Sequence, residues 1–487
     1  MAAAREAKFT TGSTMRHVVE MTLTGALGLS FMFLIDFVTL FWVSQLGEPM
    51  FVAAVGFAWT IQFFTISSGI GLMIAATALI SRAIGAKEWE AARGHATASM
   101  AITLALQGAV ALAVLIWRDE ILALLGAEGE TAAVASRFLL ISVPSLPIMA
   151  VGMVASAALR AAGDAWRAMA VTMSAGLLAL FADPLFMFTE TVLARGALVI
   201  PFGLGLGVDG AAWVVVLSRS LTAFLGLWWV IRVHDLAGPL SLAGIWRTAS
   251  PYFRIAAPAM LTQMSTPVGN FVVTYVIAGF GDAAVAGWSV VSRLQILAFG
   301  GIFALSGAIG GIIGQNYGAG LIDRVGRAYR DALLFCVLYT VVAWAILASA
   351  TGLVIREFGV PGEGAEAIRA FTYVAAGGFV FTGALFVANA AFNNLGRPLW
   401  STGFNWSRDF VLMAPFCWVF AAAFGAAGAV YGQAAAGVVV GTAAGITGWR
   451  YVRTLTPAAV EPTSAPPAVG TAKAALALTS SPTRRPE

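Results

Sequence analysis

Long apolar segments alternate with short polar connectors along most of the chain. Each segment approaches or exceeds the ~20 consecutive apolar residues that an α-helix needs to cross the hydrocarbon core of a bilayer. The pattern therefore predicts twelve membrane-spanning helices. They are expected at residues 20–44, 51–80, 96–117, 133–157, 168–189, 210–231, 252–279, 284–313, 330–354, 367–392, 400–424 and 428–449.

The composition agrees with a polytopic membrane protein. Hydrophobic residues make up 59% of the 487 residues and charged residues only 11%, whereas an ordinary soluble domain has about 25% charged residues. The arginines and lysines lie mainly in the connectors, and most are on the side that both termini share. By the positive-inside rule we expect both termini in the cytoplasm. The formal charge of +4 is then a signature of topology, and no nucleic-acid partner is expected.

The second half of the chain repeats the first. DFVTLFWVSQLGE, which begins at Asp36, aligns with NFVVTYVIAGFGD, which begins at Asn270, and AIGAK around Gly85 aligns with NYGAG around Gly318. Further on, LRAAGD and GVDGAAW align with FNNLGR and GAAGAVY. Parallel repeats of this kind are a transporter arrangement. We expect an all-α polytopic membrane protein with twelve transmembrane helices in two six-helix pseudo-repeat lobes.

The repeat and the composition divide the chain into five parts. The end of the chain is rich in Pro, Ala and Thr and has too few apolar residues to fold alone. The longest connector falls near the middle of the sequence. The expected parts are a cytoplasmic N-terminal segment 1–19, an N-lobe 20–232, a cytoplasmic inter-lobe linker 233–250, a C-lobe 251–452 and a disordered cytoplasmic tail 453–487.

Two acidic residues interrupt the apolar segments of the first half. Asp36 is the only formal charge between Leu23 and Val43. An acid at the bilayer centre costs about 2.5–3.5 kcal/mol, and intramembrane acids commonly carry ion or proton chemistry. Asp183 is followed by Pro184, whose missing N–H frees a carbonyl and tends to kink the helix. Asp36 and Asp183 are the candidate coupling site, with a structural hydrogen bond and an interfacial helix end as the alternatives.

The equivalent positions of the second half are neutral. Asn270 stands where the repeat places Asp36, and the segment MAPFCW stands where it places Asp183. The sequence therefore predicts that the buried acids belong to the N-lobe only. Arg219 and Arg293 also lie inside apolar segments, where each is expected to pair with a helix-end carbonyl, an acid or an anionic headgroup.

The sequence offers no motif for catalysis or for a resident cofactor. GLGVDG spells G-x-G-x-x-G, but no predicted strand precedes it and a membrane helix follows. The three histidines and two cysteines lack the spacing of metal ligands. No Ser/His or paired-His cluster lies within a predicted span. We expect neither an enzyme nor a metal centre nor a cofactor.

The order of DFVTLFWVSQLG, SRAIGAK, ALRAAGD, a DP dipeptide late in the fifth span and GVDGAA resembles the multidrug and toxic compound extrusion (MATE) transporters, and more narrowly their DinF-like branch. The resemblance implies two six-helix lobes in an outward-open V. It also implies coupling through aspartates of the first and fifth helices, which match Asp36 and Asp183. Ala179 departs from the branch, where an Asn often stands and would help to hold Na⁺.

The residues and this resemblance together indicate a secondary active antiporter of the bacterial inner membrane. It is expected to export drug-like, cationic organic compounds in exchange for H⁺, with Na⁺ as the other possible coupling ion. The alternative is a lipid-linked oligosaccharide flippase of the same wider superfamily, which would need basic residues to hold a pyrophosphate. We expect a monomer whose partners are small molecules and membrane lipid. Because flexible Met-rich and aromatic surfaces repack around varied ligands, the candidate substrate contacts are Met32, Phe33, Trp59, Gln62, Met173 and Asn270.

Overall fold

The computed structural model describes residues 6–189, 191–193, 198–200 and 202–456, and most of these residues are helical. The predicted disordered tail lies almost wholly outside this part of the chain. Within the first helix, the side chains of Met32, Phe33, Leu34, Asp36 and Phe37 are also outside the description.

The first half contains the 3₁₀ turn η1 (Lys8–Thr10), α1 (Thr14–Ser44), α2 (Pro49–Gly85), α3 (Trp89–Ile116), α4 (Arg118–Leu124), α5 (Gly129–Ser142), η2 (Val143–Ser145), α6 (Leu146–Ala161), α7 (Ala165–Met187), β1 (Thr191–Leu193), β2 (Leu198–Ile200) and α8 (Val208–Arg232). The second half contains α9 (Leu242–Ala278), α10 (Asp282–Gly318), α11 (Ile322–Phe358), α12 (Gly362–Tyr373), η4 (Ala375–Gly378), α13 (Phe379–Asn394), α14 (Pro398–Trp406), the π-helix η5 (Ser407–Leu412) and α15 (Met413–Thr454).

Nine helical stretches of the described chain are long and apolar enough to cross a membrane. The last of them, Pro398–Thr454, is 57 residues long and has non-helical backbone at Phe424 and Gly425, so it forms two spans. α1 and α9 have comparable lengths of 31 and 37 residues. Together these stretches make the twelve predicted transmembrane helices.

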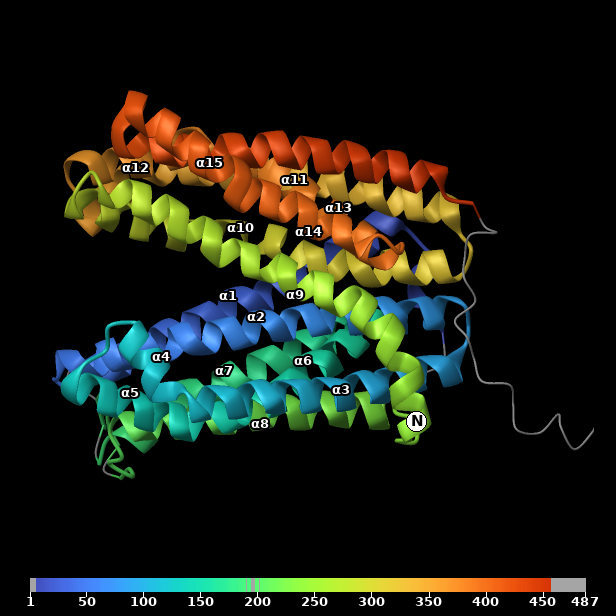
Figure 1. Cartoon of the computed structure of the whole chain (residues 1–487), viewed down its shortest axis with the longest axis horizontal. Helices are drawn as coiled ribbons and strands as arrows, with labels where there is room; N and C mark the ends of the chain where they lie inside the picture. Colours follow the sequence, from blue (N-terminus) through green and yellow to red (C-terminus); the bar gives the residue numbers. More distant parts are fainter. Residues whose placement is uncertain (1–5, 190, 194–197, 201, 457–487) are drawn as a thin grey trace, which may run out of the picture.

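The helices form two lobes that diverge at one end, with α1–α8 below and α10–α15 above in Figure 1. α9 begins beside the lower lobe at the right and runs into the upper lobe. The first helix of each half packs along the second helix of the other half, since α1 lies on α10 and α9 lies on α2. The two lobes therefore contact each other through two equivalent helix pairs.

The backbone confirms the internal repeat. Gly163 and Gly396, which the repeat aligns, have φ of 87° and 88°. Gly207 and Gly425 have φ of 59° and 61°, a left-handed region that favours glycine. Each half also breaks its fourth span with a short 3₁₀ turn, η2 in one and η4 in the other. The two halves thus share local irregularities as well as helix order.

Two details differ from the sequence prediction. A short antiparallel hairpin pairs Thr191 with Ile200 between α7 and α8, which an all-helical fold did not anticipate. The segment predicted as the inter-lobe linker, 233–250, is also partly helical, because α9 already begins at Leu242. The part of this segment that precedes α9 docks on α3, where the Gly238 N–H donates to Thr97 Oγ1 over 2.9 Å and Arg93 pairs with Asp235 over 3.2 Å.

Candidate functional site

Asp183 lies on α7 with only 1% of its surface exposed. The Thr39 hydroxyl of α1 donates a hydrogen bond of 2.5 Å to its Oδ2. α1 comes this close because Gly176, two turns earlier on α7, has no side chain; a Cβ there would lie 2.8 Å from the Ile35 side chain. The carboxyl is therefore held between the first and fifth spans of the N-lobe.

The surroundings of Asp183 are apolar. A small cluster packed beside it contains Ile35, Ala179, Ala182 and Val214. The second carboxyl oxygen, Oδ1, is buried and has no hydrogen-bond partner in the described part of the chain. A buried oxygen of this kind costs free energy until it binds a proton, a cation or a donor, so this atom is free to accept such a partner.

Asp36 lies in α1, three positions before Thr39. Positions three apart lie on nearly the same face of a helix. Its side chain, with those of Met32 and Phe33, is outside the described residues, so a site shared by Asp36 and Asp183 stays a prediction.

Pro184 lies in the last turn of α7, and the helix continues through it to Met187. The Phe188 N–H closes that turn by donating to the Pro184 carbonyl over 3.2 Å. Asp183 is buried even though it is close to the helix end, which does not fit the alternative of a carboxylate in interfacial water. The hinge or kink that the sequence predicts at Pro184 stays a prediction.

Arg219 on α8 is buried, with 7% exposure. Its guanidinium donates to the Ser142 carbonyl and the Ser145 hydroxyl, both over 3.0 Å, and to Gln62 Oε1 over 2.6 Å. Ser142 is the last residue of α5, so Arg219 binds a helix-end carbonyl, one of the three partners expected from the sequence. Gln62 also donates to the Ser142 hydroxyl over 3.3 Å, which commits its amide to this network.

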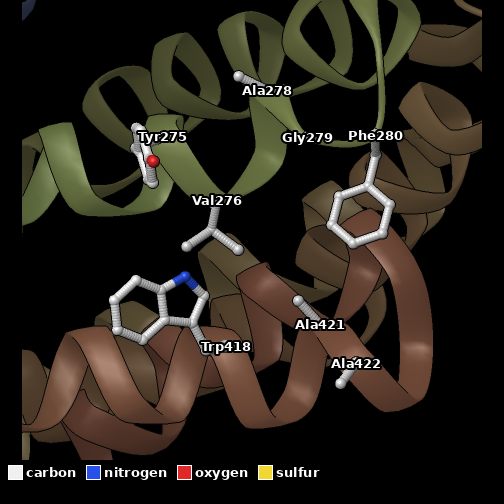
Figure 2. Close-up of a pocket in the computed structure, with 8 residues that line it drawn as sticks. All are labelled: Tyr275, Val276, Ala278, Gly279, Phe280, Trp418, Ala421 and Ala422. Atoms are coloured by element: carbon white, nitrogen blue, oxygen red, sulfur yellow. The ribbon is translucent and has the colours of Figure 1, made fainter.

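The remaining candidate substrate contacts are dispersed. Trp59 on α2 is half-buried against the N-lobe core, Met173 on α7 is half-buried, and Asn270 on α9 is exposed. Figure 2 shows a different hollow, a groove of about 510 Å³ between α9 and α15. Its lining is Tyr275, Val276, Ala278, Gly279, Phe280, Trp418, Ala421 and Ala422, and none of these residues is a predicted contact.

The prediction that buried acids belong to the N-lobe only is wrong. Asp409 in η5 is 2% exposed and the neighbouring Arg408 is 8% exposed. Arg408 Nε and NH2 donate to the two carboxyl oxygens over 2.6 and 2.9 Å, and the Ser265 hydroxyl of α9 donates to Oδ2 over 2.7 Å. The signal in the sequence is the RD pair inside the apolar segment 400–424, where Arg408 resembles a basic residue at a helix end.

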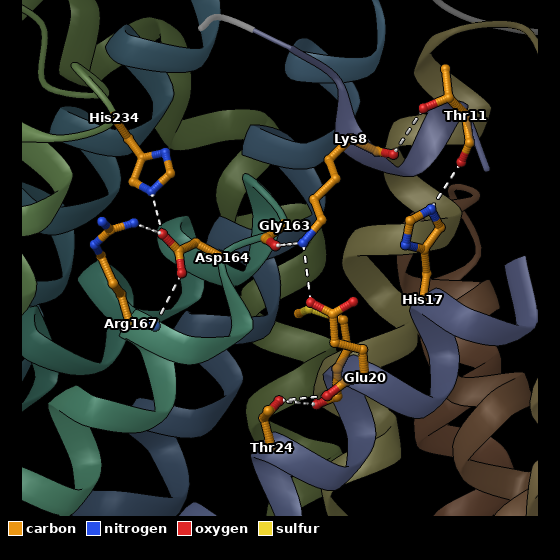
Figure 3. A network of polar contacts seen from close by, with 10 residues as sticks. Lys8, Thr11, His17, Glu20, Thr24, Gly163, Asp164, Arg167 and His234 are labelled. Carbon is orange, nitrogen blue, oxygen red and sulfur yellow. Dashed lines mark hydrogen bonds and ion pairs between the residues drawn. The ribbon is translucent and has the colours of Figure 1, made fainter. Parts of the chain in front are cut away.

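The lobes meet at the end of the bundle that carries Arg82, Gly85, Gln315 and Gly318, which we call the closed end. The Arg82 Nε donates to the Asn394 carbonyl over 2.7 Å, and the Gln315 amide donates to the Ala161 carbonyl over 2.6 Å. Both bonds join one lobe to the other. Figure 3 shows the nearby polar contacts of the N-terminal segment, in which Lys8 donates to the Gly163 carbonyl over 3.0 Å and pairs with Glu20 over 3.2 Å.

Asp164 also lies at this end, between α6 and α7, where it caps α7 by accepting from the Arg167 N–H over 3.0 Å. Its carboxylate also contacts the Arg167 guanidinium and His234 Nε2, the latter over 2.9 Å (Figure 3). Burial alone would raise the pKa of Asp164, but the hydrogen bonds from His234 and Arg167 and the charge of Arg167 hold it well below its usual range.

Comparison with known proteins agrees with this architecture. A sequence model of the MatE family matches residues 26–185 and 258–419, one segment in each half. Among curated relatives, an FAD transporter of Shewanella oneidensis is 23% identical over 402 residues, covering 82% of this chain and 86% of the relative. The multidrug export protein MepA of Staphylococcus aureus is 24% identical over 290 residues, covering 59% of this chain and 61% of MepA.

Solved structures share the fold. A mutant of the Vibrio cholerae MATE transporter VcmN superposes with a TM-score of 0.83 at 23% identity, covering 91% of this chain and 98% of that one. A multidrug resistance MATE transporter in an outward-facing conformation gives a TM-score of 0.82 at 22% identity, covering 93% and 99%. Because the family model matches both repeats of this twelve-helix fold, the chain belongs to the MATE family of multidrug and toxic compound extrusion transporters.

Proposed function

We propose that this chain is a secondary active antiporter that exports drug-like organic cations in exchange for H⁺ through a carboxylate site in the N-lobe. Asp183 and Asp36 are the coupling residues, and Na⁺ is the other possible coupling ion. The observation that carries the proposal is the buried Oδ1 of Asp183, which has no partner among the described residues while Oδ2 binds Thr39. MepA, a relative, is a multidrug export protein.

The mechanism follows from the charge of the carboxyl. An ionised carboxyl in apolar surroundings is costly, so it favours either a bound proton or a cationic substrate. The two ligands then exclude each other, which is the requirement for exchange. The packed closed end faces the cytoplasm in this proposal, with both termini inside the bacterial inner membrane, because the basic connectors lie on that side.

A second candidate is the export of an anionic nucleotide, the kind of activity that the name of the S. oneidensis relative states. Its support is Arg219, a buried cation of the N-lobe that is 7% exposed. Arginine binds phosphate groups well. The lipid-linked oligosaccharide flippase is a weaker alternative, because a pyrophosphate headgroup calls for several cations at one site and the N-lobe site centres on acids.

The test uses purified protein in proteoliposomes with an imposed pH gradient or an imposed Na⁺ gradient. A fluorescent organic cation and FAD serve as substrates. We expect the pH gradient to drive transport of the cation, and Asp183→Asn and Asp36→Asn each to abolish it. Asp209→Asn is the matched control, since Asp209 is an N-lobe acid at the start of α8 that pairs with Arg137 over 3.0 Å. Wild-type exchange by folded Asp183→Asn and Asp36→Asn proteins would exclude the N-lobe site.

A further inference from the structure

Each lobe holds a buried carboxyl that accepts a hydroxyl hydrogen bond from the first helix of its own half. Thr39 donates to Asp183 in the N-lobe, and Ser265 donates to Asp409 in the C-lobe. The donor and acceptor are 144 positions apart in both cases. The two pairs therefore join equivalent helices, the first and fifth spans of each half.

The C-lobe pair lies nearer the closed end. The repeat aligns Asp183 with the segment around Phe416, whereas Asp409 is about two helical turns earlier, on the order of 10 Å along the helix. The local backbone explains how this position holds a carboxyl. Gly269, one turn after Ser265, would place a Cβ 3.1 Å from the Asp409 Cβ, so only a residue without a side chain lets α9 approach this closely.

The decisive difference between the lobes is the partner of the carboxyl. Asp183 has one oxygen without a hydrogen-bond partner among the described residues, whereas both oxygens of Asp409 accept from Arg408. Consecutive residues of a regular α-helix do not face each other. Arg408 and Asp409 lie in the π-helix η5, a geometry that is rare and often found at functional sites, and there the Arg408 side chain makes a two-point contact with Asp409. The Arg408 guanidinium also lies 5.9 Å from the centre of the Phe386 ring.

We propose that Arg408 is a tethered counter-cation: its guanidinium neutralises Asp409 in the C-lobe, as the coupling cation neutralises the carboxyl of the N-lobe. The C-lobe then binds no coupling ion, and one lobe alone responds to the ion gradient. The N-lobe half of this comparison rests on the proposed function. Its C-lobe half, the masking of Asp409 by Arg408, stands on contacts of its own.

The charged surroundings of Asp409 are simple. α13 and α14 contain no charged residue, and the charged residues of α9 are Arg247 and Arg254, at least eleven positions before Ser265. The charged residues of α15 are Arg450 and Arg453, near its far end, and its other ionisable residues are Cys417, Tyr431 and Tyr451. Removal of the Arg408 charge would therefore leave a buried carboxylate beside a single hydroxyl. Such a group favours its neutral, proton-bound form.

The experiment counts protons bound by the full-length protein in detergent between pH 9 and pH 5. Arg408→Gln is compared with Arg408→Gln/Asp409→Asn, which differs from it by one titratable group. We expect Arg408→Gln to bind one more proton per molecule than the double variant. Arg408→Lys, which keeps a cation at the site, is expected to match the wild type. Arg408→Met keeps an unbranched apolar stem and repeats the comparison if Arg408→Gln does not purify as a folded monodisperse protein.

Equal proton counts in the single and double variants of folded protein would overturn the proposal. The same comparison in an Asp183→Asn background separates it from the proposed function. If Asp183→Asn leaves transport intact but the additional proton still appears with Arg408→Gln, the N-lobe mechanism is wrong and the masking of Asp409 stands. If Asp183→Asn abolishes transport and no additional proton appears, the N-lobe mechanism stands and the masking of Asp409 is wrong.

Discussion

Gly85 on α2 and Gly318 on α10 each lie against a backbone carbonyl of the other helix at the closed end. A methyl group at Gly85 would overlap the Gln315 carbonyl, and a methyl group at Gly318 would overlap the Arg82 carbonyl. Gly318 follows Gln315 by three positions, as Gly85 follows Arg82. The contact is thus two-fold symmetric, and it sets how closely the lobes approach.

Either Gly85→Ala or Gly318→Ala should loosen the closed end. Overpacking of a close contact costs about 1–3 kcal/mol, so each variant should unfold at a lower temperature than the wild type. Gly56→Ala on α2 and Gly307→Ala on α10 are matched controls, because no atom of the described residues lies within 4 Å of a Cβ at either position. Fluorescence-monitored thermal unfolding in detergent measures the effect. Equal unfolding temperatures for Gly85→Ala and Gly56→Ala would contradict the role of this contact.

The fold was largely predictable from the sequence because hydrophobic length and the repeat are strong signals. The alignment of Gly207 with Gly425 anticipated two glycines with nearly the same backbone conformation. The breaks at η2 and η4 were not anticipated, since a continuous apolar segment does not reveal a 3₁₀ turn inside it. The start of α9 at Leu242 was also not anticipated, because its first turns lie outside the apolar segment 252–279.

The candidate site was predictable only in part. An isolated acid such as Asp183 stands out in an apolar segment, so its burial could be expected. Asp409 stands beside Arg408, and a charge pair looks like the polar end of a helix. In the structure this pair lies in a π-helix and is buried, with Asp409 hydrogen-bonded to Ser265 and packed against Gly269. The hydroxyl partner Thr39 was also beyond prediction, because threonine is common in membrane helices and gives no pattern of its own.

Thr39 should matter for transport through its hydroxyl. Thr39→Val keeps the shape of the side chain and removes the donor to Asp183, and a hydrogen bond to a charged group contributes about 1.5–3 kcal/mol. We expect proton-driven efflux of an organic cation to fall by about tenfold or more. Thr39→Ser, which keeps the hydroxyl, should retain most of the activity. Initial rates in proteoliposomes distinguish the two, and equal rates for Val and Ser would show that the bond has no part in transport.

Asp164 should make stability depend on pH on the acid side. Its pKa in the folded protein is held below the usual range of an aspartate by His234 and Arg167. Because the pKa is lower in the folded than in the unfolded protein, the ionised carboxylate stabilises the folded state at pH values above the unfolded pKa of about 4. This contribution is lost as the pH falls toward the pKa of the folded protein. Asp164→Asn should therefore unfold at a lower temperature than the wild type at pH 7, with a free-energy loss of about 1 kcal/mol, because Asn still caps α7 but loses the ion pair with Arg167.

The difference between wild type and Asp164→Asn should shrink as the pH is lowered from 5 toward 3. Thermal unfolding at a series of pH values measures it. Asp323→Asn serves as the comparison, because Asp323 lies in the first turn of α11 and forms no ion pair within the described part of the chain. A constant difference at every pH would mean that the ionised carboxylate contributes nothing specific at this position.

The N-terminal segment should hold the two lobes together at the closed end. Phe9 is fully buried. Its N–H donates to Gln315 Oε1 over 2.9 Å, and its carbonyl accepts from Asn316 over 3.1 Å and from Arg324 over 2.9 Å. These partners belong to the C-lobe, whereas Lys8 binds the Gly163 carbonyl of the N-lobe. The segment therefore ties both lobes together beside the helix crossing.

Phe9→Ala removes the buried ring and leaves a cavity, a change that costs about 3–5 kcal/mol at a core position. Because the ring lies between the lobes, its loss should also favour opening of the closed end. The probe is Ser81→Cys, at a fully buried position of α2, in a background without Cys336 and Cys417. We expect a membrane-impermeant thiol reagent to label Cys at this position several-fold faster in Phe9→Ala than in the parent. Thr11→Ala, which removes only an exposed hydroxyl near the same turn, should leave the labelling rate unchanged. Equal labelling rates in Phe9→Ala and Thr11→Ala would show that the lobes stay closed without the Phe9 ring.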